Sequence, residues 1–467
     1  MHIHILGICG TFMGGIAVLA QSAGHRVTGC DDQVYPPMST QLKSQGIELI
    51  RGFDEDQLRL EPDLFVIGNV VSRGNPLMEA ILDRGLPFTS GPQWLADNIL
   101  CHCQVLAVAG THGKTTTSSL AAWILEDAGL RPGFLIGGVP GNFGVSARLP
   151  GDYLGDRPRL KGEVCPQDNP WFVIEADEYD TAFFDKRSKF VHYRPKVAIL
   201  NNLEYDHADI FPDVAAIETQ FHHLVRTVPR NGLLVVNGRD ERLTETLARG
   251  CWTPVTRFGT PEGWQTGAAD AAGTLTVSEE GRPVGTTDAW SLLGEHNRQN
   301  ALAALLAARF AGISVARGMQ ALGRFSGVKR RMEIRGQARG VTVYDDFAHH
   351  PTAIQTTVAG LRNKVGRARI LAVIEPRSNT MKLGVWVGSL ADSLADADRV
   401  FCYAAQLGWN AAAALRPLGE RVLTDENMDS LVDSIVKEAR EGDHILVMSN
   451  GGFGGIHEKI LKRLSEE

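Results

Sequence analysis

A lysine follows a glycine-containing loop in the segment GTHGKT, residues 110–115. Glycines let backbone amides close on phosphate oxygens, and the ammonium of Lys114 adds a positive charge beside them. The strict P-loop pattern needs a glycine five positions before Gly113, and Val108 stands there, so the textual match fails. A strand-like run before the loop and a helix-like run after it still favour a phosphate-binding loop over a surface turn. The candidate nucleotide contacts are Gly110, Thr111, His112, Gly113, Lys114, Thr115 and Thr116.

Two acidic segments follow this loop. IEADEYD (174–180) places Glu175 at the end of an apolar run, and NNLEYDHADIF (201–211) places Asp206 and His207 after the next one. Parallel sheets gather ligands outside the carboxyl ends of their strands, so we expect these side chains to face the same crevice as the lysine of the loop. Carboxylate oxygens and imidazole nitrogens can bind a Mg²⁺ ion that bridges nucleotide phosphates. Either segment alone could be a solvated loop, but together they favour phosphoryl chemistry.

A second glycine-rich turn lies at the N-terminus, in GICGTFMGG (7–15). The dinucleotide-binding fingerprint needs glycines at positions 7, 9 and 12, but Cys9 and Phe12 stand at two of them. The turn can therefore take a pyrophosphate without having the spacing of a nicotinamide site, although a tight turn without ligand remains an alternative. Asp31, at the end of the next expected strand, can accept hydrogen bonds from a ribose or a base.

Short β-branched runs alternate with helix-length segments along the chain, which predicts parallel sheets with crossover helices. We therefore expect an α/β fold of three domains, at residues 1–100, 101–325 and 326–467. Residues 150–170 fit a surface loop, and residues 259–290 fit edge strands or loops. Strand segments are expected at 2–8, 25–31, 63–69, 86–95, 104–110, 171–177, 196–202, 232–237, 340–351, 369–376, 399–403 and 444–455, and a helix at 14–24.

The composition of the 467 residues is that of a soluble globular protein, with 43% hydrophobic and 22% charged residues. A formal net charge of −7 gives no electrostatic reason to expect nucleic acid or an anionic membrane as a partner. No apolar run has the length of a membrane span, and the first residues lack the features of a secretion signal. Seven scattered cysteines suit a reducing compartment, so we expect a cytoplasmic protein.

The chain resembles the Mur ligase family, the ATP-dependent amide-forming ligases of peptidoglycan synthesis, over nearly its whole length. It is most similar to the branch that accepts UDP-N-acetylmuramate, which shares DDFAHHPT-type and GxxGxxMGG-type segments. The resemblance implies an N-terminal Rossmann-like UDP-binding domain, a central P-loop ATPase-like domain and a C-terminal Rossmann-like domain for the amine or peptide. Six segments carry it in the order of the family: AGTHGKTTT, EADEYD, NNLEYDHAD, GEHNRQN (294–300), KRRMEIRG (329–336) and YDDFAHHPT (344–352).

The resemblance also implies roles for single residues. Lys114 would contact the β- and γ-phosphates of ATP, Thr115 and Glu175 would bind one Mg²⁺, and His207 would bind a second. Several members carry a carbamylated lysine beyond their DHAD-like motif, but residues 208–225 contain no lysine, so we expect no such group here. The implied catalytic residues are Lys114, Glu175, His207 and Arg331. Further nucleotide contacts would come from Asn297 and Asn300 beside the adenine, from Arg331, from Asp346 on the ribose and from His349 near the phosphates.

The implied reaction joins the recycled peptide L-alanyl-γ-D-glutamyl-meso-diaminopimelate to UDP-N-acetylmuramate through an acyl phosphate. Free L-alanine is the alternative amine, and peptides of four or five residues and the oligomeric state stay open. A nicotinamide-dependent oxidoreductase, from another class, is disfavoured by the failed fingerprint. The candidate contacts to the UDP-sugar are Gly7, Cys9, Gly10, Thr11, Met13, Gly14, Asp31, Asn69 and Asn75, and those to the peptide are Arg377, Ser378 and Asn379, which follow an expected strand.

Overall fold

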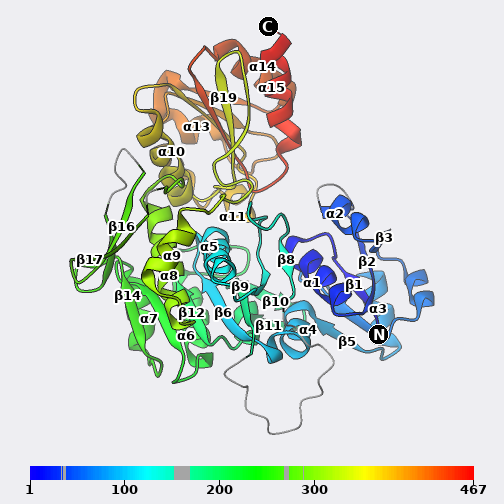
Figure 1. Ribbon diagram of the computed structural model, residues 1–467. Helices are drawn as coiled ribbons and strands as arrows, with labels where there is room; N and C mark the ends of the chain where they lie inside the picture. The colour runs from blue at the N-terminus through cyan, green and yellow to red at the C-terminus, as the bar shows by residue number, and fades with distance from the viewer. Residues whose placement is uncertain (33, 35–37, 152–168, 268–272, 288, 467) are drawn as a thin grey trace. The chain divides into compact units, whose positions relative to one another are not determined.

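The computed structural model describes residues 1–32, 34, 38–151, 169–267, 273–287 and 289–466. These residues form two compact units. The first unit comprises Met1–Glu204, Ala215–Trp290 and Gln299–Ser326, and the second comprises Tyr205–Val214, Ser291–Arg298 and Gly327–Glu467. The predicted α/β class is confirmed, because each unit is built on mainly parallel sheets with helices between the strands (Figure 1). The domain boundaries near residues 100 and 325 stay a prediction.

The N-terminal part of the first unit is a five-stranded parallel sheet with the order β3-β2-β1-β4-β5. Because β1 is central, the turn that follows it lies between the carboxyl ends of β2 and β4, where α/β sheets bind their ligands. The strands are β1 (His2–Leu6), β2 (Arg26–Asp31), β3 (Glu48–Arg51), β4 (Leu64–Ile67) and β5 (Phe88–Ser90), and the helices are α1 (Thr11–Ser22), α2 (Met38–Ser44), η1 (Glu55–Leu60), α3 (Pro76–Asp83), α4 (Gly91–Asn98) and η2 (Leu100–His102).

The first helix begins earlier than the sequence predicts. We expected a helix over 14–24, but α1 begins at Thr11 and contains Gly14 and Gly15. Glycine is a poor helix former, which hides the first turn from a pattern-based prediction. The structure explains the glycines by close packing: a Cβ on Gly15 would lie 2.1 Å from a methyl carbon of Leu135. Gly15 therefore lets α1 approach the neighbouring sheet, while Gly14 leaves room for the side chain of Met38 in α2.

That neighbouring sheet has ten strands in the order β17-β16-β15-β14-β13-β12-β6-β9-β7-β8. Its central strands are parallel, and β16, β17 and β8 add antiparallel edges, so the prediction of edge strands within 259–290 is confirmed. Most of the predicted loop 150–170 lies outside the described residues.

The strands of this sheet are β6 (Gln104–Ala109), β7 (Gly133–Leu135), β8 (Ala147–Arg148), β9 (Trp171–Ala176), β12 (Val197–Leu200), β13 (Leu233–Asn237), β14 (Val255–Phe258), β15 (Trp264–Thr266), β16 (Leu275–Glu279) and β17 (Arg282–Thr287). A separate antiparallel hairpin is formed by β10 (Asp180–Ala182) and β11 (Asp185–Ser188), followed by η3 (Lys189–His192). The helices are α5 (Lys114–Asp127), α6 (Val214–Thr227), α7 (Glu241–Ala248), α8 (Glu295–Phe310) and α9 (Val315–Leu322).

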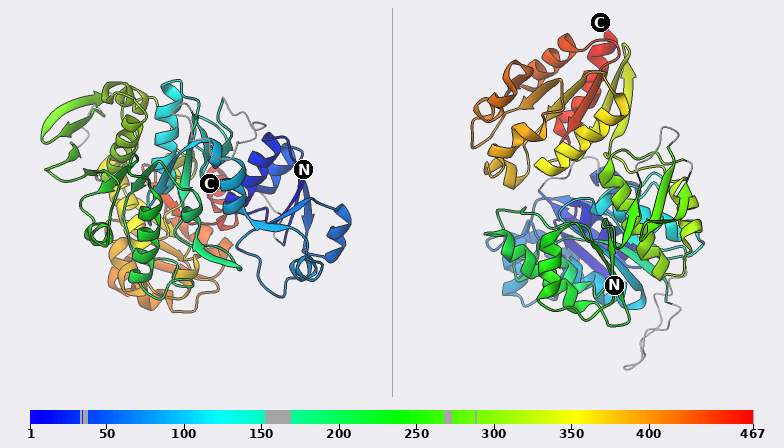
Figure 2. Two further views of the ribbon diagram at one scale, coloured as in Figure 1. Left: turned by 90° about the horizontal axis from the view of Figure 1, so that it is seen from below. Right: turned by 90° about the vertical axis from the view of Figure 1, so that its left-hand side faces the viewer.

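The second unit holds a six-stranded sheet with the order β18-β19-β23-β20-β21-β22, parallel except for β18. Its strands alternate buried apolar side chains toward two cores, one with α10, α12 and α13 and the other with α14 and α15. Figure 2 shows the helices and strands of this unit in two further views. The strands are β18 (Glu333–Ala338), β19 (Val341–Asp346), β20 (Ile370–Ile374), β21 (Arg399–Tyr403), β22 (Val422–Asp425) and β23 (His444–Met448). The helices are α10 (Pro351–Val365), α11 (Asn379–Lys382), α12 (Val387–Ser393), α13 (Ala411–Leu415), η4 (Arg416–Arg421), α14 (Met428–Glu438), η5 (Phe453–Gly455) and α15 (Ile456–Glu466).

Among the helices of the described residues, none combines the length and the apolar character that crossing a bilayer requires.

Candidate functional site

The predicted phosphate loop joins the central strand β6 to helix α5. Gly113 adopts a φ of +79°, which side chains of L-residues rarely tolerate, and α5 begins at Lys114. A Cβ on Gly113 would also lie 2.6 Å from the Oδ1 atom of Asn300. The predicted strand–loop–helix arrangement is therefore confirmed, and a glycine is required at this position by both backbone and space.

The ammonium of Lys114 lies among acceptors of its own unit. Its Nζ atom donates to the carbonyl oxygen of Gly110 at 2.7 Å and to Oε2 of Glu178 at 3.0 Å, and lies 3.7 Å from Oδ1 of Asp177. Burial lowers the pKa of Lys114, but the charges of Glu178 and Asp177 more than offset it, so the pKa lies above its usual value. Lys114 therefore stays protonated and positively charged at the point where the loop meets α5.

Glu175 is the next-to-last residue of strand β9, beside the same loop. Its Oε1 atom accepts a hydrogen bond of 2.7 Å from the hydroxyl of Thr115, and its other oxygen accepts from the backbone amide of Gly137. The structure thus brings together the two oxygen ligands predicted for one Mg²⁺. The hydroxyl comes from the first turn of α5 and the carboxylate from β9, and such oxygen ligands suit a hard cation, so these residues fit a magnesium ion.

The loop is also fastened to the end of strand β12. The backbone amide of His112 donates to Oδ1 of Asn202 at 2.8 Å, and the amide of Glu204 donates to the hydroxyl of Thr111 at 2.8 Å. Thr117, in the first turns of α5, accepts a hydrogen bond of 2.9 Å from the side chain of Asn201. The carboxyl ends of β6, β9 and β12 therefore converge on the loop, as the prediction of a parallel sheet requires.

At the N-terminal sheet, the turn after β1 is fixed to the end of β2. Gly7 adopts a φ of +78°, and the amide of Cys9 donates to Oδ2 of Asp31 at 3.0 Å. Asn69 is exposed just after β4, at the same edge of the sheet. The structure therefore places these four predicted substrate contacts at one edge of the sheet.

Other predicted UDP-sugar contacts pack against neighbouring residues or cap a helix. Met13 is buried, and its thioether lies so close to Gly91 that a Cβ there would be 2.7 Å from the sulfur atom. Gly14 faces Met38 at a similarly short distance. Asn75 caps α3 by accepting a hydrogen bond of 3.0 Å from the amide of Met78. Met13 and Gly14 are buried, and the amide of Gly14 already donates to the carbonyl oxygen of Gly10 at 2.7 Å, while Gly10 and Thr11 are exposed at the start of α1.

In the second unit, the segment that carries Asp206 and His207 joins the start of α11. Oδ1 of Asp206 accepts from the hydroxyl of Thr380 at 3.0 Å, and Oδ2 of Asp209 accepts from the side-chain amide of Asn379 at 2.8 Å. Burial raises the pKa of Asp206, but the nearby imidazoles, first that of His207, hold it below its usual value. The backbone φ of His207 is +54°, which is uncommon for a residue with a side chain and is typical of constrained functional segments.

Strand β19 ends at Asp346, which is buried. Its carboxylate accepts hydrogen bonds of 2.8 Å from the amides of Met332 and Ala348, while the guanidinium of Arg331 lies 4.9 Å from the ring centre of Phe347. Burial raises the pKa of Asp346, although the charge of Arg331 opposes this. The two predicted nucleotide contacts, Arg331 and Asp346, therefore share one corner of the second unit.

Two further predicted nucleotide contacts of the second unit each lie within hydrogen-bond distance of a backbone carbonyl oxygen a few residues earlier in the chain. The side-chain amide of Asn297 donates to the carbonyl oxygen of Leu293 at 2.7 Å, and Nδ1 of His349 lies 3.0 Å from the carbonyl oxygen of Phe347. Their roles toward a nucleotide stay predictions.

The predicted peptide contacts follow strand β20. Arg377 is exposed and pairs only at 3.7 Å with Glu375, and its side chain covers Gly451, where a Cβ would lie 2.6 Å from the Cδ atom. Ser378 caps α11 by accepting from the amide of Met381 at 3.3 Å. Gly451 belongs to the glycine-rich segment after β23, so the two predicted loops lie side by side.

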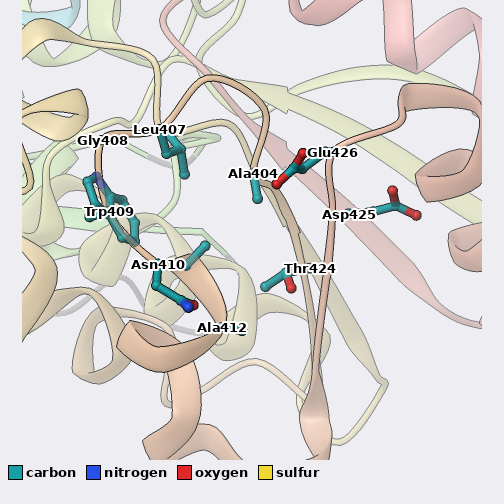
Figure 3. Close-up of a pocket in the computed structure, with 10 residues that line it drawn as sticks. Ala404, Leu407, Gly408, Trp409, Asn410, Ala412, Thr424, Asp425 and Glu426 are labelled. Carbon is teal, nitrogen blue, oxygen red and sulfur yellow. The ribbon is translucent and has the colours of Figure 1, made fainter.

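A hollow of about 580 Å³ lies at the carboxyl ends of β21 and β22 (Figure 3). The indole of Trp409 lines it and donates to the carbonyl oxygen of Met381 at 2.7 Å, which attaches the hollow to α11. The carboxylate of Glu426 lies beside Ala404 at its opposite side. The carboxylate of Asp425 instead accepts from the amide of Asn427 and the hydroxyl of Ser430. No motif in the sequence indicates this hollow.

Three charged residues near the phosphate loop were not among the predicted site residues. Glu178 and Asp177 were visible in the segment EADEYD, but its sequence does not say which carboxylate faces Lys114. Lys189, in the hairpin region after β9, gave no signal in the sequence.

Comparison with known proteins covers all parts of the chain. Family profiles match residues 2–100 (Mur ligase family, catalytic domain), 108–308 (Mur ligase middle domain) and 330–451 (Mur ligase, glutamate ligase domain). The chain is 55% identical to the UDP-N-acetylmuramate–L-alanyl-γ-D-glutamyl-meso-2,6-diaminoheptandioate ligase of Escherichia coli K12, covering 100% of this chain and 99% of the relative. It is 50% identical to the protein of the same name from Haemophilus influenzae, over 99% of both chains.

A solved structure extends this comparison. The murein peptide ligase of Psychrobacter arcticus 273-4 is 45% identical and superposes with a TM-score of 0.75, covering 100% of this chain and 99% of that chain. Family profiles, full-length relatives and a full-length structure thus agree on the family. The chain belongs to the Mur ligase family of ATP-dependent ligases.

Proposed function

We propose that the chain joins L-alanyl-γ-D-glutamyl-meso-diaminopimelate to UDP-N-acetylmuramate, with ATP converted to ADP and phosphate. The observation that carries the proposal is the phosphate loop, with Lys114 and the Thr115–Glu175 pair at one sheet edge. The full-length identity of 55% to the Escherichia coli ligase with these substrates in its name supports the choice of substrates. A cytoplasmic location is part of the same proposal.

The phosphate loop would bind the β- and γ-phosphates through its backbone amides, through the N-terminus of α5 and through Lys114. Thr115 and Glu175 would hold one Mg²⁺, with His207 proposed for a second, and Mg²⁺ supplies charge neutralisation for phosphates when bound. Asn297, Asn300, Arg331, Asp346 and His349 are proposed as further contacts of the nucleotide. The turn after β1, Asp31, Asn69 and Asn75 are proposed for the UDP-sugar.

The proposed chemistry needs little covalent help from the protein. The lactyl carboxylate of the sugar attacks the γ-phosphorus, the bond to the β-phosphate oxygen breaks, and ADP leaves an acyl phosphate behind. The peptide amine then attacks the acyl carbon, phosphate leaves, and the amine loses a proton. The ammonium of Lys114 neutralises negative charge that develops on the transferred group, which is an electrostatic contribution.

The choice of a peptide over free alanine has support in the second unit. Arg377 presents an exposed guanidinium that can bind a carboxylate through two parallel hydrogen bonds. The hollow beside α11 offers about 580 Å³ of further space, in the range of ordinary ligand pockets. A free alanine has one carboxylate and needs no such space, whereas a tripeptide has several polar groups to place.

The test is ADP release with UDP-N-acetylmuramate and either the tripeptide or L-alanine, with the product identified by mass spectrometry. We expect rapid release with the tripeptide and at least a hundredfold slower release with alanine. Equal rates would contradict the peptide assignment and favour the alanine ligase. An absorbance change with nicotinamide cofactors, recorded in parallel, would instead support an oxidoreductase.

A further inference from the structure

A buried lysine lies next to the phosphate loop and has no part in the proposed mechanism so far. Lys189 begins η3, directly after the hairpin β10–β11, and its side chain is 4% exposed. Its backbone amide donates to the carbonyl oxygen of Tyr179 at 3.1 Å, and the hydroxyl of Ser188 donates to the carbonyl oxygen of Glu178. The backbone of this lysine is therefore held firmly against the segment that follows β9.

The ammonium of Lys189 is surrounded by rings. It lies 4.0 Å from the ring centre of Tyr179 and 4.6 Å from that of Phe12, and its one ion-pair partner, Oδ2 of Asp177, is 4.0 Å away. It makes no hydrogen bond within the described part of the chain. Burial lowers the pKa of Lys189 to about 8, although the charges of Asp177 and Asp180 oppose this shift; the charge of Lys114 adds to it. An ammonium has three donors, and burying them unused is costly unless a partner arrives.

The position of this ammonium joins two candidate sites of the same unit. Phe12 belongs to the first turn of α1, directly after the turn proposed for the UDP-sugar. On the other side, the carboxylate of Asp177 is shared, with Oδ2 toward Lys189 and Oδ1 at 3.7 Å from Lys114. Lys189 therefore lies between the proposed sugar-nucleotide turn and the proposed phosphate site. The reacting carboxylate of the acid substrate must pass through this same interval.

We propose that Lys189 binds the carboxylate of the acid substrate, the group that is phosphorylated, and orients it toward the phosphate loop. This inference rests on the proposed function. The ammonium of Lys189 can donate hydrogen bonds to a carboxylate, whereas the two aromatic rings have no oxygen or nitrogen acceptor facing it. Charge-assisted hydrogen bonds of this kind are about twice as strong as neutral ones. Asp177 would retain Lys114 as a partner when Lys189 turns to the substrate.

Two other roles are compatible with a cation at this place. Lys189 could bind the pyrophosphate of the UDP moiety, which is also an anion, or its cation–π contacts could serve packing alone. The carboxylate is favoured because Lys189 shares Asp177 with the lysine of the phosphate loop.

The experiment compares three ligands by calorimetry, without ATP or peptide. UDP carries only the pyrophosphate, UDP-N-acetylglucosamine adds the sugar, and UDP-N-acetylmuramate adds the lactyl carboxylate. In the wild-type protein we expect the muramate to bind at least tenfold more tightly than the glucosamine compound, because only the muramate carries the carboxylate that accepts a charge-assisted hydrogen bond. In Lys189→Met the ratio should fall to near one, with UDP affinity unchanged, and Lys189→Arg should keep part of the preference.

The matched control is Lys186→Met on the same hairpin, whose ammonium is exposed and pairs with Asp180 at 2.6 Å. It should leave all three affinities unchanged. A tenfold preference that survives in Lys189→Met, or an equal loss of all three ligands including UDP, would overturn the inference. If the wild-type protein ligates the tripeptide and Lys189→Met gives either of these results, only this inference is overturned. A wild-type protein that ligates nothing overturns the proposed function.

Discussion

The phosphate loop and the segment after β20 occupy equivalent places at the carboxyl ends of parallel strands, but they differ in how their charges are held. The Lys114 side chain is 13% exposed and already contacts two carboxylates, whereas the Arg377 side chain is 43% exposed with one long ion pair. A buried, paired cation is organised before its ligand arrives, while an exposed one adapts to its ligand. Changes at the phosphate loop should therefore have large effects on turnover, and changes after β20 should have graded effects on peptide affinity.

The largest expected effect follows from removing the cation of the loop. Lys114→Ala should lower kcat by about three orders of magnitude, because a charge that neutralises the transferring phosphoryl group is lost. UDP-N-acetylmuramate affinity should stay within a few fold of the wild-type value. The measurement is steady-state ADP release together with calorimetric binding. Turnover within a few fold of wild type would remove Lys114 from the proposed chemistry.

A smaller effect is expected from the proposed metal ligand of the second unit. His207→Ala should raise the Mg²⁺ concentration needed for half-maximal activity by about tenfold, since water would replace one ligand. The test is a magnesium titration of ADP release at saturating substrates. His223→Ala is the control, because this histidine lies on α6 and is not among the proposed metal ligands. Superimposable titration curves for wild type and His207→Ala would identify His207 as a structural loop residue.

The comparison is sharpened by a change on the peptide side. Arg377→Ala should raise the KM for the tripeptide about tenfold or more, with little change in kcat or in the KM for ATP, because charge-assisted hydrogen bonds to a carboxylate are lost. Arg377→Lys should recover only part of the affinity, since an ammonium cannot form the two parallel bonds. A fall in kcat with an unchanged tripeptide KM would place Arg377 with the phosphate chemistry instead.

These two regions also differ in how far the sequence could predict them. The strand, loop and helix around Lys114 were predictable because glycine, lysine and apolar runs act locally there. The predicted start of α1 was wrong, because Gly14 and Gly15 reduce helix propensity while allowing close contacts with residues distant in the sequence. Lys189 could not have been singled out, because its burial depends on Phe12, which is far away in the sequence.

The segment with Asp206 shows the same limit. Its sequence predicted a cluster at a strand end, but the hydrogen bond to Thr380 is a tertiary contact that no local pattern encodes. The hollow beside Trp409 likewise depends on how the loop after β21 lies against α11. Motifs therefore predicted candidate residues for the chemistry, and the packing of distant segments determined the partners of those residues.

The smallest expected effect concerns this tertiary contact. Thr380 is 2% exposed, donates to Asp206 and accepts from the amide of Ala208 at 3.3 Å. Thr380→Val keeps the shape but removes the hydroxyl, so we expect the free energy of unfolding to fall by about 1 kcal/mol at pH 7. Thr380→Ser, which keeps the hydroxyl, is the control for the lost donor. Urea denaturation of both variants measures the difference.

The pH dependence of this effect has a defined sign. The folded-state pKa of Asp206 is lowered, so its contribution to stability is present at neutral pH and is lost as the pH falls through that pKa. Removing the Thr380 donor raises the folded-state pKa, because hydrogen bonds to a carboxylate favour its charged form. Acid unfolding of Thr380→Val, followed by circular dichroism, should therefore begin at a higher pH than for wild type and Thr380→Ser. Coincident acid-unfolding curves for all three proteins would show that the bond between Asp206 and Thr380 does not stabilise the charged carboxylate, and that this segment is held by its backbone contacts alone.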